Sequence, residues 1–114
     1  MNIDDQIPGW VSQAALLIET DIRKHLTIRE IAFRVGTNSN SLKQKFREVY
    51  GVGPYQYLSN VRLKKATELL LGKDQPLKAI AKQVGYKTAS SFIAAFRKKY
   101  GTTPTLWKKS GKVK

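Results

Sequence analysis

The chain has 114 residues, enough for one ordinary domain or two very small ones, and 41% of them are hydrophobic, which excludes a disordered polybasic tail. It carries 21 Lys and Arg residues against 8 Asp and Glu residues, has no cysteine and has one histidine, His25, so it cannot form disulfides, thiolate metal sites or a multi-histidine metal site. The longest uninterrupted apolar run, Ala14–Ile18, is far shorter than the roughly 20 residues that span a bilayer, and no signal-peptide pattern begins at Met1, so we expect a soluble, cytoplasmic protein whose partner is a polyanion.

Helix start and stop signals follow one another along the chain, and no run of residues alternates in the manner of a strand. Thr27 and Glu30 have the spacing of a capping box, in which each side chain accepts a hydrogen bond from the backbone amide of the other residue. Gly36 then provides a left-handed C-cap that ends a short helix. In the first half of the chain we predict helices over Val11–Lys24, from the capping box to Gly36, and over about Ser39–Tyr50. A long helix then runs from Pro54 to about Leu71. In the second half we predict helices from Pro76 to Gly85, over about Thr88–Tyr100 and from Pro104 onward, followed by a basic tail over Ser110–Lys114.

The two halves of the chain repeat one pattern. The motif Ile31-Ala32-x-x-Val35-Gly36 recurs 49 residues later as Ile80-Ala81-x-x-Val84-Gly85. A second set of positions recurs 50 residues later: Leu42, Phe46, Arg47, Tyr50, Gly51, Pro54 and Tyr57 match Phe92, Phe96, Arg97, Tyr100, Gly101, Pro104 and Trp107. The chain is therefore a tandem repeat. We predict a first lobe over residues 1–53, a linker helix over 54–72, a second lobe over 73–109 and a tail over 110–114.

The repeated unit has the pattern of a helix-turn-helix. Its alanine allows the second helix to approach closely, isoleucine and valine fill the crossing, and glycine provides the positive φ of the turn. In the second helix an inward face is formed by Leu42, Phe46 and Val49, and in the other copy by Phe92, Phe96 and either Lys99 or Tyr100.

The outward face of this second helix is polar in the first copy, where it carries Asn40, Lys43, Gln44 and Arg47. Such side chains can hydrogen-bond base edges in the major groove of DNA, and a plain solvated helix face is the alternative interpretation. The charge favours DNA: residues 1–57 carry 7 basic and 6 acidic residues, whereas residues 58–114 carry 14 and 2. Lysines that served solubility alone would normally be balanced by glutamates.

Three motifs follow one another in the order Arg62-Leu63-x-x-Ala66-x-x-Leu69-Leu70, Ile80-Ala81-x-x-Val84-Gly85-Tyr86 and Ser91-Phe92-x-x-x-Phe96-Arg97-Lys98-x-Tyr100-Gly101-x-x-Pro104. With these motifs the chain resembles the DNA-binding domain of the AraC/XylS family of bacterial transcription regulators, over about Val11 to Lys108. The resemblance implies an all-α fold of about seven helices, in which a long linker helix joins two helix-turn-helix subdomains. It also implies that residues 39–50 and 89–100 enter successive major grooves of double-stranded promoter DNA, and that the protein engages RNA polymerase. No cofactor is expected.

By position, the resemblance places base-reading residues at Asn40, Lys43 and Gln44 in the first lobe and at Ala89, Ser90, Ile93 and Ala94 in the second. The sequence departs from the family pattern at Ala94, where members often have a long polar residue, frequently arginine. The side chains of Ile93 and Ala94 have no hydrogen-bonding groups, so they can only contact thymine methyl groups or exclude water. For Ile93, packing against a neighbouring lobe or chain is the alternative. The residues expected to contact phosphates, which position a protein without specifying sequence, are Ser39, Lys87, Thr88, Arg97, Lys98 and Lys99.

We therefore predict sequence-specific binding of double-stranded DNA by two tandem helix-turn-helix lobes, and we expect the protein to regulate bacterial transcription as an activator. The alternatives are a tandem-helical module whose basic face binds an acidic protein and a nonspecific nucleic-acid binder. Nothing indicates an enzyme, because Gly51-x-Gly53 lacks the third glycine and the preceding strand of a dinucleotide site, and His25 fits a structural role or exposure to solvent. Many family members carry a sensor domain before the DNA-binding domain. Because only Met1–Trp10 precede the first predicted helix, we expect a fragment of a longer regulator, with a naturally small regulator as the alternative.

Overall fold

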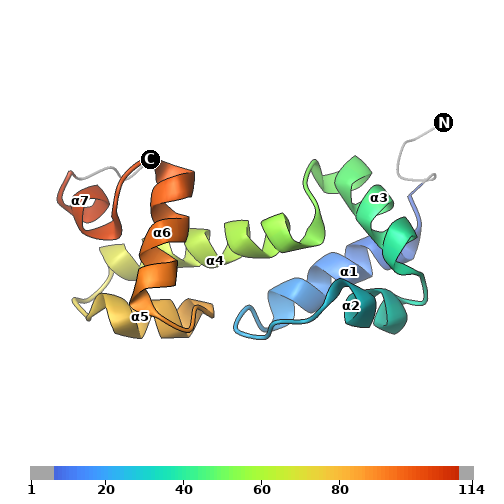
Figure 1. Cartoon of the computed structure of the whole chain (residues 1–114), viewed down its shortest axis with the longest axis horizontal. Coiled ribbons are helices and arrows are strands. Elements are labelled where there is room, and N and C mark those ends of the chain that lie inside the picture. Colours follow the sequence, from blue (N-terminus) through green and yellow to red (C-terminus); the bar gives the residue numbers. More distant parts are fainter. Residues whose placement is uncertain (1–6, 111–114) are drawn as a thin grey trace. The chain divides into compact units, whose positions relative to one another are not determined.

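The computed structural model describes residues 7–110, which form helices joined by short turns (Figure 1). The helices of this part are α1 Gly9–Thr20, α2 Ile28–Val35, α3 Ser39–Tyr50, α4 Pro54–Leu71, α5 Leu77–Val84, α6 Ala89–Tyr100 and α7 Pro104–Lys109. Since residues 7–110 contain seven helices and no strand, the predicted all-α fold is confirmed. Of the predicted basic tail, residues 111–114 lie outside the described residues, and Ser110 is the C-cap of α7.

The chain forms two compact units, Met1–Leu58 and Ser59–Lys114, and the boundary between them falls inside α4. The core of the first unit is built by α1, α2 and α3 and includes Leu58 from the first half of α4. The second unit contains the remainder of α4 together with α5, α6 and α7. The finer division into lobes over residues 1–53 and 73–109 with a linker helix over 54–72 stays a prediction.

The helix ends follow the predicted capping signals. At the start of α2 the Thr27 hydroxyl accepts a hydrogen bond from the Glu30 amide at 3.0 Å, and the Glu30 carboxylate accepts one from the Thr27 amide at 3.1 Å. Gly36 ends α2 in the left-handed conformation, with φ 80°, and its counterpart Gly85 ends α5 with φ 106°. The capping box and both glycine C-caps are therefore confirmed.

The first helix differs from its prediction, because α1 covers Gly9–Thr20 and not Val11–Lys24. Asp21 stops it: its backbone is extended, and its carboxylate accepts a hydrogen bond from the Arg23 amide at 3.1 Å. The Lys24 amide then donates to the Asp21 carbonyl at 3.1 Å and closes a turn. Aspartate offers the backbone this local alternative to a helix, and the apolar pattern of the preceding residues does not reveal it.

An equivalent group of three aromatic rings lies in each unit. The ring-centroid distances are 4.6 Å for Phe46–Tyr50 and 5.2 Å for Phe46–Tyr57 in the first unit, and 4.6 Å for Phe96–Tyr100 and 5.9 Å for Phe96–Trp107 in the second. The repeat predicted from the sequence, including the match of Tyr57 with Trp107, therefore places matching rings in matching positions. Of the two alternatives for the inward face of α6, Tyr100 contacts Phe96, whereas Lys99 is exposed.

The two members of the Tyr57–Trp107 match differ in their polar contacts. The Tyr57 hydroxyl donates a hydrogen bond to the Glu19 carboxylate, a contact between α4 and α1 within the first unit. Burial, and to a lesser extent this hydrogen bond, raise the pKa of Tyr57 to about 12. The indole of Trp107 has a single N–H donor and no titratable group, so this hydroxyl–carboxylate hydrogen bond is particular to the first unit.

The structure also extends the repeat to a helix pair for which the sequence analysis predicted no match. Three buried residues of α1 have the same spacing as three buried residues of α4: Val11, Ala14 and Ile18 match Leu63, Ala66 and Leu70, each 52 residues later. The second part of α4 therefore has the same pattern of buried residues in the second unit that α1 has in the first. Each unit consists of this supporting helix, a helix-turn-helix and a following aromatic residue.

Candidate nucleic-acid interface

Both helix-turn-helix units bring their two helices together over a small buried residue. Ala32 in α2 is 2% exposed and Ala81 in α5 is 1% exposed, next to Ile31 and Ile80, which are equally buried. A methyl group at this crossing allows the following helix to pack closely, as predicted. The close packing determines which side of α3 and of α6 is left for solvent.

The start of each second helix is fixed by a side-chain cap. The Asn38 side chain accepts a hydrogen bond from the Ser41 amide at 2.9 Å at the start of α3. The Thr88 hydroxyl accepts one from the Ser91 amide at 3.1 Å at the start of α6. Because the caps occupy matching positions, the two helices present matching residues outward, with a shift of 50 between α3 and α6.

The outward side of α3 is polar, as predicted. Leu42 and Phe46 are fully buried on the inner side. On the outer side lie four exposed residues, which we call the α3 face: Asn40, Lys43, Gln44 and Arg47. The first turn also contains Ser39, which is half-buried. The structure thus gathers on one surface all the residues for which base reading by the first lobe is predicted.

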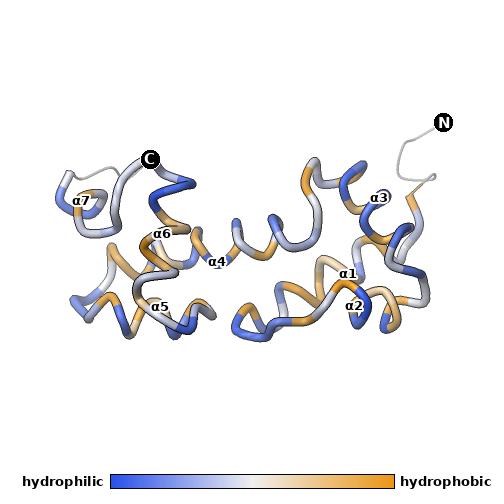
Figure 2. Tube along the Cα trace, viewed as in Figure 1, coloured by the Kyte–Doolittle hydropathy of each residue, from blue (hydrophilic) through white to orange (hydrophobic). Residues whose placement is uncertain are grey.

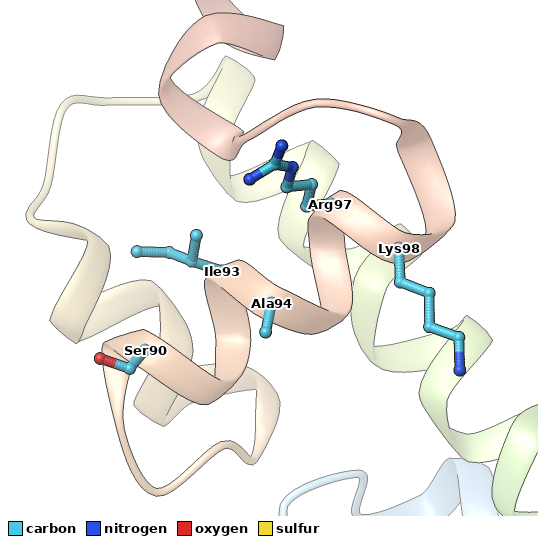
Figure 3. A pocket seen from close by; sticks show the side chains of 5 residues that line it. All are labelled: Ser90, Ile93, Ala94, Arg97 and Lys98. Carbon is cyan, nitrogen blue, oxygen red and sulfur yellow. The ribbon is translucent and has the colours of Figure 1, made fainter.

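The outward side of α6 has a different chemistry. Phe92 and Phe96 are fully buried, like their counterparts in α3. The outer side carries an open hollow, and we call its lining residues the α6 face: Ser90, Ile93, Ala94, Arg97 and Lys98 (Figure 3). Figure 2 shows the contrast, since α3 is hydrophilic along most of its length and α6 is hydrophilic chiefly at its C-terminal end. Ala89, also predicted to read bases, is half-buried at the start of α6.

The residues predicted to contact phosphate differ in their surroundings. Lys87, Arg97 and Lys98 are exposed. The Lys99 ammonium group instead donates a hydrogen bond to the Asn60 side chain at 3.2 Å. Thr88 is exposed, and its hydroxyl already serves as the cap of α6. One of the three N–H donors of Lys99 is therefore engaged with Asn60, whereas Lys98 lines the open hollow.

One positively charged residue of the second unit is buried, and the sequence motifs that contain it predict no role for it. Arg62 of α4 is only 7% exposed, and its guanidinium lies 5.5 Å from the centre of the Tyr86 ring. Tyr86 in turn lies 5.8 Å from Phe92, so Arg62 supports the turn that leads into α6. Burial lowers the pKa of Arg62. The sequence does contain a signal for this supporting role, because Arg62 stands among the apolar residues that form the buried side of its helix.

Two weaker sequence features have structural roles. His25 stacks against Tyr55, with ring centroids 5.8 Å apart and an interplanar angle of 17°. Gly51 is the left-handed C-cap of α3, with φ 80°, as expected for a helix end. No helix in the described part of the chain is long and apolar enough to cross a membrane.

Comparisons with known proteins agree with this geometry. The sequence model of a family described as "Helix-turn-helix domain" matches residues 31–110. The chain is similar to the lactose operon transcription activator of Staphylococcus xylosus, with 30% identity over 90 residues that make up 79% of this chain and 32% of that protein. It spans between 29% and 37% of the lengths of four curated relatives that it matches.

Solved structures have the same fold. The C-terminal domain of AraT, a response regulator from Geobacillus stearothermophilus, is 27% identical with a TM-score of 0.85 over 92% of this chain and 88% of that chain. A transcriptional regulator of Chromobacterium violaceum with an AraC-type DNA-binding domain shares the fold, with a TM-score of 0.83, 24% identity and 98% of each chain covered. Because the helix-turn-helix family model covers well over half of the chain, the chain belongs to the helix-turn-helix DNA-binding domains of the AraC/XylS family.

Proposed function

We propose that this chain binds double-stranded promoter DNA sequence-specifically, with α3 and α6 each in a major groove, and so regulates transcription. The observation that carries the proposal is the repetition of one helix-turn-helix, in which the buried side is the same in both copies and the opposite side is open. An α-helix fits the major groove of B-DNA, where every base pair presents a distinct pattern of donors and acceptors.

The α3 face supplies the base-reading groups of this proposal. The Gln44 and Asn40 amides can each donate and accept, a pairing that suits adenine, while the cations of Lys43 and Arg47 suit the acceptors of guanine. All four residues are exposed on one side of α3. We therefore assign most of the sequence choice to the first helix-turn-helix.

The second unit supplies most of the affinity in this proposal. Residues 59–114 carry 14 basic and 2 acidic residues, whereas residues 1–58 carry 7 and 6. Attraction to phosphates depends on such local charge, and Lys87, Arg97 and Lys98 are exposed where α6 would meet the backbone of DNA. Ser39, Thr88 and Lys99 are further phosphate contacts of the proposal.

The regulatory part of the proposal reaches beyond the chain itself. The Staphylococcus xylosus relative is named as a transcription activator. By analogy, we propose that this chain acts in the bacterial cytoplasm, activates transcription by engaging RNA polymerase at promoters, and works together with a sensor domain. A pull-down of purified RNA polymerase on promoter DNA, with and without the chain, tests the polymerase contact.

Selection of bound sites from random double-stranded DNA tests the central proposal. We expect one enriched site with two parts about one helical turn apart, because two reading helices would enter successive grooves. A variant with both Lys43→Ala and Gln44→Ala is the matched control and should lose preference in one part only. A protein-interaction module would enrich no site, and a nonspecific binder would bind scrambled DNA as tightly as any selected sequence, so either result contradicts the proposal.

A further inference from the structure

The hollow on α6 combines apolar and cationic side chains on one open surface. In Figure 3, Ser90, Ile93 and Arg97 project toward one side of the helix, and Ala94 and Lys98 project from the adjoining side. Arg97 and Lys98 each follow an apolar residue of the hollow by four positions, which is about one helical turn or 5.4 Å along the axis. The apolar part of the hollow therefore has its cations at one end only.

The chemistry of the apolar part restricts what it can recognise. Ile93 and Ala94 neither donate nor accept hydrogen bonds through their side chains. The major groove presents one apolar group, the C5 methyl of thymine, and every other distinguishing feature of a base edge there is a donor or an acceptor. A base edge with an unpaired donor or acceptor would lose water against these side chains without gaining a partner.

The matching positions of α3 strengthen this reading. Lys43 and Gln44 stand where α6 has Ile93 and Ala94, on a helix with the same cap position and the same buried positions. The difference therefore lies in the contact chemistry and not in how the helix is presented. Arg97 and Lys98, one turn further along, are placed to hold a neighbouring phosphate while the apolar residues meet the base pair.

We propose that the α6 face selects thymine through its methyl group, with Ile93 and Ala94 as the specificity-determining residues. This inference rests on the proposed function, because it requires α6 to lie in a major groove. It assigns the second helix-turn-helix a base preference of its own that uses no side-chain hydrogen bond from these two positions.

Removing or adding one methyl group on a DNA base tests the proposal directly. The full chain is titrated onto a selected site in which each thymine is replaced in turn by uracil, which lacks only the methyl group. In the α6 part of the site, we expect affinity to fall about three- to fivefold at one or two positions, as for the loss of one buried methyl group. Replacing cytosine by 5-methylcytosine at those positions should recover part of the affinity that cytosine loses. Uracil elsewhere in the site is the control and should have little effect.

Two protein variants identify the contacting residues. Ala94→Gln gives α6 the residue found in α3, and we expect the preferred base at one position to shift from thymine toward adenine. Ile93→Ala should reduce the uracil effect while leaving the fold intact by circular dichroism, because Ile93 is only half-buried. The α6 part is the part of the site whose base preference survives when Lys43 and Gln44 are both replaced by alanine, so its definition does not depend on Ile93 or Ala94.

The outcomes separate this inference from the proposed function. Sequence-specific binding with no loss on uracil substitution at any thymine of the α6 part, or with no thymine selected there, overturns methyl recognition alone. Equal affinity for selected and scrambled DNA overturns the proposed function and methyl recognition with it. A uracil effect that Ile93→Ala and Ala94→Gln leave unchanged overturns the assignment to these residues.

Discussion

The two units of the chain share the positions of many buried residues and differ in what they expose. Phe46 and Phe96 are both fully buried and contact equivalent rings, whereas Lys43 and Gln44 on α3 correspond to Ile93 and Ala94 on α6. The net charge differs as well, +1 for residues 1–58 and +12 for residues 59–114. Core positions are constrained by packing, and outward positions are not. One scaffold can therefore be used twice, once with polar groups suited to reading bases and once with charge suited to affinity.

The largest expected effect tests the shared core. Phe46→Ala and Phe96→Ala should each lower the free energy of unfolding by about 3–5 kcal/mol, because each leaves a cavity at a fully buried position. Hydrogen exchange resolved by residue should show the loss in the unit that carries the substitution. A variant that stays fully folded and yet fails to bind DNA would instead make its phenylalanine a contact residue.

The next effect tests the exposed difference. Lys43→Ala or Gln44→Ala should each weaken binding to a selected site by about 1–3 kcal/mol, with a much smaller loss on scrambled DNA. Ser90→Ala, at a position of the α6 face where base reading is also predicted, gives the comparison between the two units and should cost less on the selected site. Fluorescence anisotropy at fixed salt measures all three variants. Equal losses on selected and scrambled DNA would mean that Lys43 and Gln44 contact phosphates only.

A smaller effect on stability is expected from the N-cap of the first helix of each helix-turn-helix, where the two units differ. α2 has a capping box, whereas the N-cap of α5, Pro76, makes no side-chain cap hydrogen bond. Thr27→Ala should cost about 1 kcal/mol in chemical denaturation, and Thr27→Ser should cost less because it retains the acceptor. If Thr27→Ala and Thr27→Ser behave alike, the cap hydrogen bond is not what stabilises α2.

The same capping box has a predictable pH dependence. The hydrogen bond from the Thr27 backbone, followed by that from its side chain, lowers the pKa of Glu30. The ionised Glu30 carboxylate therefore stabilises the folded protein at a pH above the ordinary pKa of glutamate. This stabilisation is lost as the pH falls through the lowered pKa that Glu30 has in the folded protein. Comparison with Glu30→Gln by unfolding at pH 7 and at pH 3 should show the difference between the two proteins shrinking at the lower pH.

The smallest expected effect concerns two neighbouring lysines of the second unit. If the chain neutralises about eight phosphates, log K should fall with log salt at a slope of about −7. Lys98→Ala should flatten this slope by about 1 unit and leave the preferred sequence unchanged. Lys99→Ala should flatten it less, because Lys99 already donates to Asn60. Equal changes for the two variants would show that Lys99 exchanges Asn60 for a phosphate at no cost.

Much of this architecture was predictable because its signals are short-range. The sequence predicted α3 with its observed bounds and α6 to within one residue at its start. Helix caps join residues three positions apart, and the buried side of a helix follows from its own periodicity. The α3 face could be predicted for the same reason, because the positions of Leu42 and Phe46 fix which residues point away.

Predictions were weaker where residues distant in the chain, or a competing local bond, decide the outcome. The end of α1 depends on a turn at Asp21, which helical periodicity does not detect. The role of Arg62 depends on Tyr86, and the hydrogen bond of Lys99 depends on Asn60, 39 residues away. Neither the Arg62–Tyr86 pair nor the Lys99–Asn60 pair has a spacing that a local pattern could identify.

Local sequence patterns were sufficient to predict the number of helices, the capping box of α2, the glycine C-caps, the tandem repeat and the side of each second helix that faces outward, although the bounds of α1 differ. Apart from the repeat, which is a match between segments 49 or 50 residues apart, these features depend on the order of residues within a few turns. The folded chain was needed to see that α4 serves both units, with Leu58 in the core of the first and Leu63, Ala66 and Leu70 repeating the buried side of α1 in the second. A helix of 18 residues has the same hydrogen bonds wherever its partners lie. Its division between two cores arises from which distant side chains pack against each half.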